Sequence, residues 1–365
     1  MKKYGLVLAG GGGKGAYQLG AWKALSEMGI EFEAIAGVSI GSINGALIAA
    51  GDYEKAVEMW KSVSVDKGIK ITEVLPDSEN LFSRKNWGAL FKEFLKNGGI
   101  DASPMVSFLS QYINEEKIRQ SAVPFGIITV QMTQGVTPLE LFIDDIPEGT
   151  LIDYLLASSN VPLVTNIGPE GEKFLDGGVY DNIPVTTLKK RGFNKLIIID
   201  ISKIKGVSHS LDIFNSEIVY IRPYDIDDLG QTFDFDEEIT NKRITLGYLD
   251  ARKAFSFLLG KIYYFEPEVF RGMVKEYGAD TLQNLEEFAE FLKLDKAKVY
   301  TQQSFIFELK LLYEQSKLEE AEKQEAQQTA QESEGFKFSF LKRFTQKKNF
   351  DDFQDAIAVL ENYII

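Results

Sequence analysis

Short apolar runs alternate with stretches of helical spacing through the first 200 residues of the chain. The apolar run at 4–10 predicts a buried strand, and after a glycine turn the segment 16–29 carries apolar residues at helical spacing. A second strand is expected at 33–39, followed directly by a helix at 42–51 whose small residues suit close packing on a sheet. Two successive strand-turn-helix units predict an α/β fold with a parallel sheet.

The same alternation continues toward residue 205. Further elements are expected in the order strand, helix, strand, helix, strand, at 123–132, 150–159, 172–176, 185–192 and 194–200. The core is therefore expected to span about residues 1–205, and the pattern at 240–260 predicts a further helix that closes it.

Two other regions differ from this core. Residues 52–120 have helical patterning with bulky apolar side chains, which favours a helical insertion packed on the sheet; a lid or an acyl-chain wall is the functional alternative. The C-terminal part is mostly helical and charged, and 319–335 is a low-complexity run without an apolar face, expected to be a solvated helix or a flexible linker. We therefore expect one domain over 1–260 and a helical accessory region over 261–365.

The composition argues against several classes of binding partner and of metal site. The 365 residues are 44% hydrophobic, enough for a sizeable core, and the net charge of −14 with dispersed basic residues argues against a nucleic-acid partner. With no cysteine and one histidine, neither disulfides nor a Cys/His metal site is expected. The N-terminal apolar run is too short for a signal peptide, and no apolar stretch is long enough to span a membrane. A cytoplasmic protein is expected.

The stretch Gly37-Val38-Ser39-Ile40-Gly41 has the glycine-x-serine-x-glycine form of a nucleophile elbow, at the turn from a strand into a helix. A serine placed in this way is usually activated by histidine. The single histidine, His209, lies in a polar run away from the other catalytic signals. A different side chain is therefore needed to take the proton from Ser39.

A glycine run follows the first strand: Gly10, Gly11, Gly12, Gly13, Lys14 and Gly15. A P-loop needs Ser or Thr after the lysine, and here glycine follows it. A dinucleotide-binding turn is matched by the first, third and last glycines, with Glu31 or Glu33 as the acidic partner. The third possible use is an oxyanion hole, in which backbone N–H groups stabilise a tetrahedral intermediate and glycine permits close approach of the substrate.

The neighbouring serine elbow favours the oxyanion hole, because a dinucleotide site has no use for a strained serine at the end of the next strand. Both motifs are expected at the carboxyl ends of adjacent parallel strands, where α/β folds place their sites. For either motif alone, a tight turn with close packing is the plainer interpretation.

Carboxylates at strand ends are the candidates for the base. Asp176 ends a strand and is followed by Gly177 and Gly178, which allow a sharp bend and close approach. An aspartate hydrogen-bonded to a serine hydroxyl in a dry crevice can act as general base, and desolvation raises its basicity. Asp200, at the end of the next strand, is the alternative, and capping of the following turn is the plainer role for both.

With these three motifs in this order, the sequence resembles the patatin-like phospholipases of the bacterial type, which use a Ser-Asp dyad without histidine. Further similar segments stand at 157–162, 176–184 and 247–251, and the resemblance covers about residues 4–255. It implies a three-layer α/β/α domain with a mainly parallel central sheet, an acyl hydrolase of glycerolipid or phospholipid esters, and no metal or organic cofactor.

The resemblance also implies roles for the motif residues. Ser39 would be the nucleophile and Asp176 the base, acting through an acyl-enzyme that water then cleaves. Lys14 would assist electrostatically, or would be a solvated residue at the first turn of a helix. The glycine run would supply the oxyanion hole, with N–H groups from Gly11, Gly12 and Gly13 and with the loop shaped by Gly10 and Gly15.

Two alternative functions stay open, a non-catalytic lipid-binding scaffold and a nucleotide-binding α/β protein. The segment 336–348 places four phenylalanines and a leucine among lysines and an arginine, which suits peripheral contact with an anionic membrane, or a core helix with a basic exposed side. Apolar residues in the insertion motivate a binding region for long acyl chains: Trp87, Leu90, Phe91 and Phe94.

Overall fold

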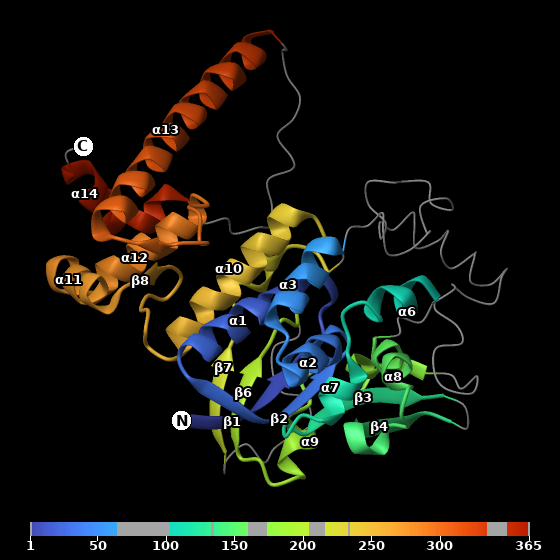
Figure 1. Ribbon diagram of the computed structural model, residues 1–365. Coiled ribbons are helices and arrows are strands. Elements are labelled where there is room, and N and C mark those ends of the chain that lie inside the picture. The colour runs from blue at the N-terminus through green and yellow to red at the C-terminus, as the bar shows by residue number, and fades with distance from the viewer. Residues whose placement is uncertain are drawn as a thin grey trace. The chain divides into compact units, whose positions relative to one another are not determined.

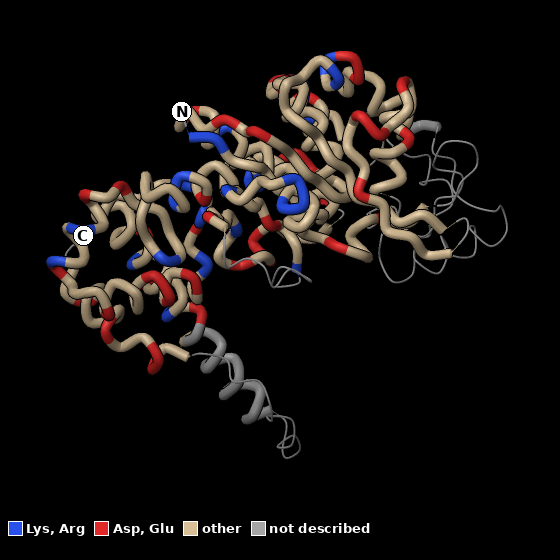
Figure 2. Tube along the Cα trace, turned by 90° about the horizontal axis from the view of Figure 1, so that it is seen from below, with Lys and Arg blue, Asp and Glu red and all other residues tan. Residues whose placement is uncertain are grey.

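The chain divides into two compact units, Met1–Ala254 and Phe255–Ile365 (Figure 1). The computed structural model describes residues 2–63, 103–132, 135–159, 174–203, 216–232, 234–333 and 349–363. Most of the predicted insertion, His209 and the segment 336–348 therefore lie outside the described residues. Figure 2 shows acidic and basic residues interspersed along the described parts of both units.

The first unit is built on a seven-stranded sheet in the order β4-β3-β2-β1-β6-β7, with β5 paired to β3. β1, β2, β3, β6 and β7 are parallel, and β4 and β5 run antiparallel to β3. The prediction of a mainly parallel sheet is confirmed. The strands are β1 Lys2–Leu8, β2 Ile30–Val38, β3 Phe125–Gln131, β4 Thr137–Phe142, β5 Phe174–Asp176, β6 Lys195–Ile199 and β7 Glu217–Ile221.

Helices connect these strands. The α-helices are α1 Ala16–Glu27, α2 Ile40–Ala50, α3 Tyr53–Ser62, α6 Ser103–Leu109, α7 Glu115–Arg119, α8 Leu151–Ser158, α9 Val185–Lys189 and α10 Glu237–Ala254. Short 3-10 turns are η1 Gly12–Gly15, η2 Ile143–Asp145, η4 Gly177–Val179 and η6 Ile226–Leu229.

Helices cover both faces of the sheet (Figure 1). A Cβ on Gly45 of α2 would meet the Ile35 side chain at 3.3 Å, so α2 lies on the face to which Ile35 points. Ile35 pairs with Leu6 of β1, and the preceding Gly5 points to the opposite face, where a Cβ would meet Leu188 of α9 at 3.0 Å. The implied three-layer α/β/α arrangement is confirmed.

The strands β4 and β7 have no counterpart among the sequence-predicted elements. β4 carries Pro138, which pattern analysis counts against a strand, but as an edge strand it tolerates a residue without an N–H donor. β7 is five residues long and half-exposed at the other edge. The first unit extends past residue 205 to Ala254, because β7 and α10 belong to it, and α10 lies where a helix closing the core was expected at 240–260.

The helices α1 and α10 cross at two glycines. A Cβ on Gly20 would lie 1.8 Å from the backbone oxygen of Ile244, and one on Gly247 would lie 1.9 Å from that of Tyr17. The Tyr17 hydroxyl donates to Asp250 across the same interface at 2.7 Å. This close crossing fixes α10 against the helix that follows the glycine run.

Gly20→Ala is therefore expected to destabilise the first unit by about 3 kcal/mol or more, because the backbones must separate. Gly272→Ala in α11 (Pro267–Tyr277) is the matched control, since a Cβ there meets nothing within 4 Å. The control is expected to be neutral or to stabilise by up to about 1 kcal/mol. Urea unfolding followed by circular dichroism measures both, and equal midpoints for the two variants would contradict the crossing.

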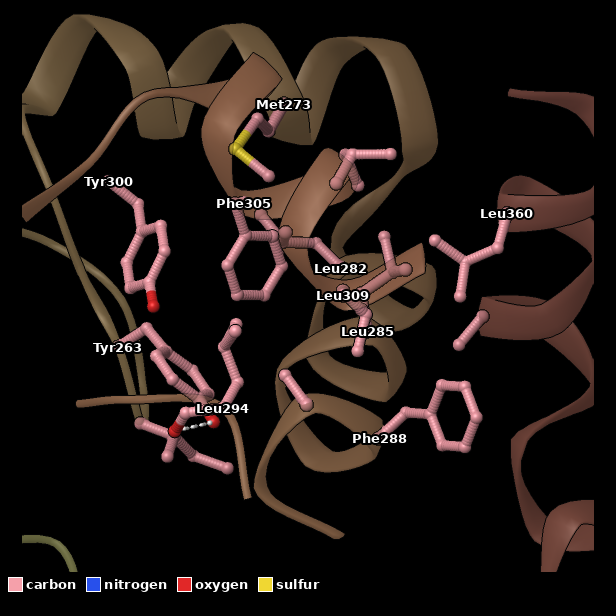
Figure 3. Packing of buried hydrophobic residues seen from close by; sticks show 14 of the residues in the cluster. Tyr263, Met273, Leu282, Leu285, Phe288, Leu294, Tyr300, Phe305, Leu309 and Leu360 are labelled. Carbon is pink, nitrogen blue, oxygen red and sulfur yellow. Dashed lines mark hydrogen bonds between the residues drawn. The ribbon is translucent and has the colours of Figure 1, made fainter. Parts of the chain in front are cut away.

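The second unit is mainly helical. Its apolar core includes Tyr263, Phe288 and Phe305, with the Tyr263 and Phe305 rings 5.3 Å apart (Figure 3). The buried Glu286 carboxylate accepts from three successive backbone N–H groups, those of residues 261–263. The elements are β8 Tyr264–Phe265, α11, α12 Ala279–Phe291, β9 Val299–Tyr300, α13 Gln302–Ser333, η7 Phe350–Phe353 and α14 Gln354–Asn362.

The predicted low-complexity run falls largely within α13, which is helical to Ser333. Among the described residues of both units, no helix is long and apolar enough to cross a membrane.

Candidate active site

Ser39 stands at a sharp turn between β2 and α2. Its φ of 54° and ψ of −132° are unusual for a residue other than glycine, and such a conformation costs about 1–3 kcal/mol. A Cβ on Gly37 would lie 2.2 Å from the Gly41 backbone oxygen, and one on Gly41 would lie 2.4 Å from that of Leu8. Both glycines of the elbow are therefore required by close backbone approach.

The edge of β3 brings Asp176 to Ser39. Residues 125–128 of β3 pair with the end of β2, and residues 129–131 pair with β5 in the opposite direction. Ile128 thus pairs with Val38, and the next residue, Thr129, pairs with Asp176. β5 continues the line of β2 along one edge, so the ends of the two strands meet.

The two predicted side chains are hydrogen-bonded. Ser39 Oγ donates to Asp176 Oδ2 at 2.7 Å, and the Gly178 N–H donates to Asp176 Oδ1 at 2.7 Å. Burial raises the pKa of Asp176 above its usual value, and the hydrogen bonds from Ser39 and Gly178 lower it by less. The arrangement provides a carboxylate of increased basicity directly on the serine hydroxyl.

Other hydroxyls hold the backbone of the elbow. The Ser39 N–H donates to Ser158 Oγ at 3.0 Å, and Ser158 in turn donates to the Ile128 backbone oxygen at 2.6 Å. The Ser39 backbone oxygen accepts from the N–H and hydroxyl of Ser42 at 2.8 and 2.7 Å. These bonds offset the cost of the strained conformation.

The glycine run is packed against protein on its outer side. The Gly13 N–H donates to the Thr232 backbone oxygen at 2.6 Å, and the Gly10 N–H donates to that of Asn182 at 3.3 Å. Within the described part of the chain, the N–H groups of Gly11 and Gly12 have no acceptor. Of the predicted oxyanion set, Gly11 and Gly12 therefore keep N–H groups for a ligand, and Gly10 and Gly13 shape the loop.

Close contacts explain why this run is glycine. A Cβ on Gly11 would lie 2.8 Å from the Ile201 side chain, and one on Gly12, at a φ of 57°, would lie 2.6 Å from the Thr232 backbone oxygen. A Cβ on Gly15 would lie 2.6 Å from Ile40, next to the elbow serine. A larger residue at any of these three positions would clash with neighbouring parts of the chain.

Asn182 links the glycine run to the segment that follows Asp176. Its side-chain amide donates to the Gly10 backbone oxygen at 3.3 Å, beside the backbone bond from the Gly10 N–H. A Cβ on Gly10 would lie 2.5 Å from Asn182 Oδ1 and 3.1 Å from the Ser39 Cβ. A Cβ on Gly178 would also meet Asn182 Oδ1, at 2.6 Å. The three sequence motifs therefore converge on one place.

The interpretation of Lys14 as a solvated residue was wrong. Its side chain is only 1% exposed, because η1 is packed under the loop that contains Thr232. Burial lowers the pKa of Lys14, and the neighbouring Lys203 lowers it further. A buried lysine therefore lies within the glycine run.

Asp200, the alternative base, is fully engaged elsewhere. It accepts from the Ser202 N–H at 2.8 Å, from Tyr220 at 2.5 Å and from Arg222 at 2.7 Å. These bonds make it a capping residue of the turn after β6. That turn includes Ile201, which contacts Gly11.

Sequence reasoning did not identify Ser158, Asn182 or Arg243 as parts of this site. Ser158 and Asn182 lie in segments already noted as similar to the family, whereas Arg243 is an ordinary charged position in a helical pattern. No group of acidic or histidine side chains that could hold a metal ion is present among the described residues.

The three motifs lie in a region that matches a known protein family. The family described as Patatin-like phospholipase matches residues 6–189. Lysophospholipase NTE1 of Candida glabrata is 30% identical over 203 residues, covering 55% of this chain and 10% of the relative. Lysophospholipase NTE1 of Saccharomyces cerevisiae is 29% identical over 200 residues, covering 54% and 11%. The chain thus spans about a tenth of the length of these relatives.

Solved structures give weaker likenesses. VipD from Legionella pneumophila aligns over 86% of this chain and 80% of its own, with 14% identity and a TM-score of 0.39. ExoU in its complex with SpcU from Pseudomonas aeruginosa aligns over 85% and 66%, with 18% identity and a TM-score of 0.35. The family match covers all three motifs and half of the chain, and on that ground the chain belongs to the patatin-like phospholipase family.

Proposed function

We propose that this protein is a serine acyl hydrolase that cleaves ester bonds of glycerolipids through a Ser39-Asp176 dyad. The observation that carries the proposal is the 2.7 Å hydrogen bond from Ser39 Oγ to a desolvated carboxylate. Family membership supports lipid esters as the substrate class.

In the first half of the reaction Asp176 accepts the hydroxyl proton as Ser39 Oγ attacks the ester carbonyl carbon. The carbonyl oxygen becomes an oxyanion, which the N–H groups of Gly11 and Gly12 stabilise. The intermediate collapses as the C–O bond to the alcohol breaks, and protonated Asp176 returns the proton to that oxygen. An acyl-enzyme on Ser39 and a free alcohol result.

In the second half Asp176 takes a proton from water, which attacks the acyl carbon. The tetrahedral intermediate uses the same donors, and Ser39 Oγ leaves and recovers the proton from Asp176. The fatty acid is released. One carboxylate therefore serves both steps, and electrostatic assistance by Lys14 stays a prediction.

The names of the relatives make lysophospholipids the first substrates to test. Purified wild type and Ser39→Ala are incubated with lysophosphatidylcholine micelles, diacylphosphatidylcholine vesicles and a triacylglycerol emulsion, and released fatty acid is measured by mass spectrometry. We expect release from at least the lysophospholipid by wild type and none by Ser39→Ala. Binding of lysolipid without release would favour a lipid-binding scaffold, and a higher melting temperature with NAD or FAD would favour a nucleotide-binding protein.

The predicted acyl-chain region leads to an expectation on chain length. If apolar residues of the insertion bind the acyl chain, each buried methylene contributes about 0.8 kcal/mol, so kcat/KM should rise from acetyl to longer esters. p-Nitrophenyl esters of increasing length, assayed below micelle formation, measure this. A preference for the acetyl ester would exclude such a region.

A further inference from the structure

Arg243 of α10 is fully buried, and within the described residues its hydrogen bonds all go to backbone oxygens. Its Nε donates to Leu229 at 2.7 Å, and its Nη2 donates to Gln231 at 2.7 Å. Its Nη1 donates to Asp234 at 2.5 Å and to Gly13 at 3.0 Å. One guanidinium therefore joins the loop 229–234 to the glycine run.

The same loop contacts the glycine run directly. The Gly13 N–H donates to the Thr232 backbone oxygen at 2.6 Å, so both polar groups of Gly13 are held, its N–H by the loop and its C=O by Arg243. The next turn adds a bond from the Lys14 N–H to the Gly11 backbone oxygen at 3.4 Å. Glycine peptides reorient easily, and these bonds select one orientation.

Burial of this guanidinium disfavours its charged form. Burial lowers the pKa of Arg243 to about 10, and Asp234 and Asp236 raise it by less. Burying a cation that carbonyl groups alone hold costs free energy. The helix crossing at Gly20 and Gly247 holds Arg243 in place beside the glycine run, because the adjacent residue, Ile244, contacts α1 at that crossing.

We infer that Arg243 is a positioning residue that fixes the Gly11 and Gly12 N–H groups for the oxyanion. This inference rests on the proposed hydrolase function. Oxyanion donors accelerate a reaction because they are already oriented when charge develops. The hydrogen bonds that join Arg243 to Gly13 and to the loop 229–234 are called the clamp here. Weakening the clamp should therefore lower kcat while leaving KM, which reflects binding of the neutral ester, nearly unchanged.

The test uses Arg243→Lys, which keeps the charge but cannot reach all four carbonyl groups. We expect kcat to fall by about 10- to 100-fold, with KM within about threefold. Affinity for a trifluoromethyl ketone, whose adduct carries an oxyanion, should fall by the same factor as kcat/KM. Hydrogen exchange of the peptide containing residues 9–19 should be faster than in wild type.

Asp250→Asn is the matched control. Asp250 is buried in the same helix and bonds Tyr17 of α1, yet it lies outside the glycine run. It should lower the melting temperature with kcat per titrated active site unchanged. A milder variant, Asp234→Ala, removes the 2.8 Å bond from the Gln231 N–H to Asp234 Oδ2 and should lower kcat in the same direction by less.

Wild-type kcat and wild-type exchange in Arg243→Lys and Asp234→Ala would overturn the inference. An equal loss of kcat in Asp250→Asn would do the same, since a merely structural role predicts it. If wild type hydrolyses no ester, the proposed function fails, and the exchange comparison still tests the clamp. Faster exchange at 9–19 in both clamp variants supports it when the increase exceeds that in Asp250→Asn, which also affects this peptide through the hydrogen bond to Tyr17.

Discussion

Asp176→Asn is expected to lower kcat/KM for ester hydrolysis by about 10⁴-fold, the upper end for loss of a general base. Asparagine keeps an oxygen for the 2.7 Å bond from the Gly178 N–H, so the turn is preserved. The amide cannot take the proton from Ser39 Oγ, and acylation and deacylation both fail. Steady-state kinetics with a soluble short-chain ester measures the loss.

The same substitution should not destabilise the protein at neutral pH. Burial raises the pKa of Asp176 in the folded state above its unfolded value, so the native state holds this proton more tightly. The contribution of this group to stability therefore decreases as pH rises from the unfolded toward the folded pKa. A neutral asparagine avoids the cost of the buried charge, and an unchanged or higher melting temperature is expected.

Activity follows the opposite direction with pH. Because only ionised Asp176 can act as base, kcat/KM should rise with pH through the raised pKa of this carboxylate. His209→Ala is the control and should keep near-full activity and the same pH profile. Loss of activity in His209→Ala with activity retained in Asp176→Asn would contradict the dyad.

Gly12→Ala is expected to lower kcat by about 10²- to 10³-fold, the cost of losing one oxyanion donor. The added Cβ would lie 2.6 Å from the Thr232 backbone oxygen, so the Gly11-Gly12 segment must move from its present position. Alanine at a φ of 57° also adds conformational strain. Initial rates on a soluble ester, with active sites titrated by a fluorophosphonate, measure the effect.

Gly51→Ala is the control that distinguishes the effect of backbone strain from the effect of moving the glycine run. Gly51 has a φ of 68° at the end of α2, and a Cβ there meets nothing within 4 Å. It should lose about 1 kcal/mol of stability and keep its kcat. If Gly12→Ala behaves like Gly51→Ala, the glycine run is not the oxyanion hole.

Local sequence signals were sufficient for the elements on which the site stands. The glycine run and the elbow each follow an apolar strand, and the Asp-Gly-Gly turn follows the short strand Phe174–Asp176; such strand-turn junctions can be predicted without tertiary information. The edge strand β4 was not predicted because Pro138 and exposed polar residues hide it. Its pairing with β3 is set by position in the sheet rather than by its own pattern.

The contacts that complete the site could not be predicted from local sequence signals. That β5 continues the line of β2 along β3 depends on two pairings between separate segments, Val38 with Ile128 and Thr129 with Asp176. The burial of Lys14 and the reach of Arg243 to Gly13 depend on how α10 crosses α1. Sequence patterns identified Ser39 and Asp176 as candidates, and the structure brings the two side chains within hydrogen-bond distance, while their orientation depends on long-range packing.

The most direct test of the dyad is the rate of covalent labelling of Ser39. Wild type, Ser39→Ala, Asp176→Asn and His209→Ala are reacted with a fluorophosphonate, and the adduct is located by peptide mass spectrometry. We expect labelling at Ser39 in wild type and at the same rate in His209→Ala, with labelling abolished in Ser39→Ala and slowed by orders of magnitude in Asp176→Asn. Labelling of Ser39 at the wild-type rate in Asp176→Asn, or an adduct on another residue, would contradict the account.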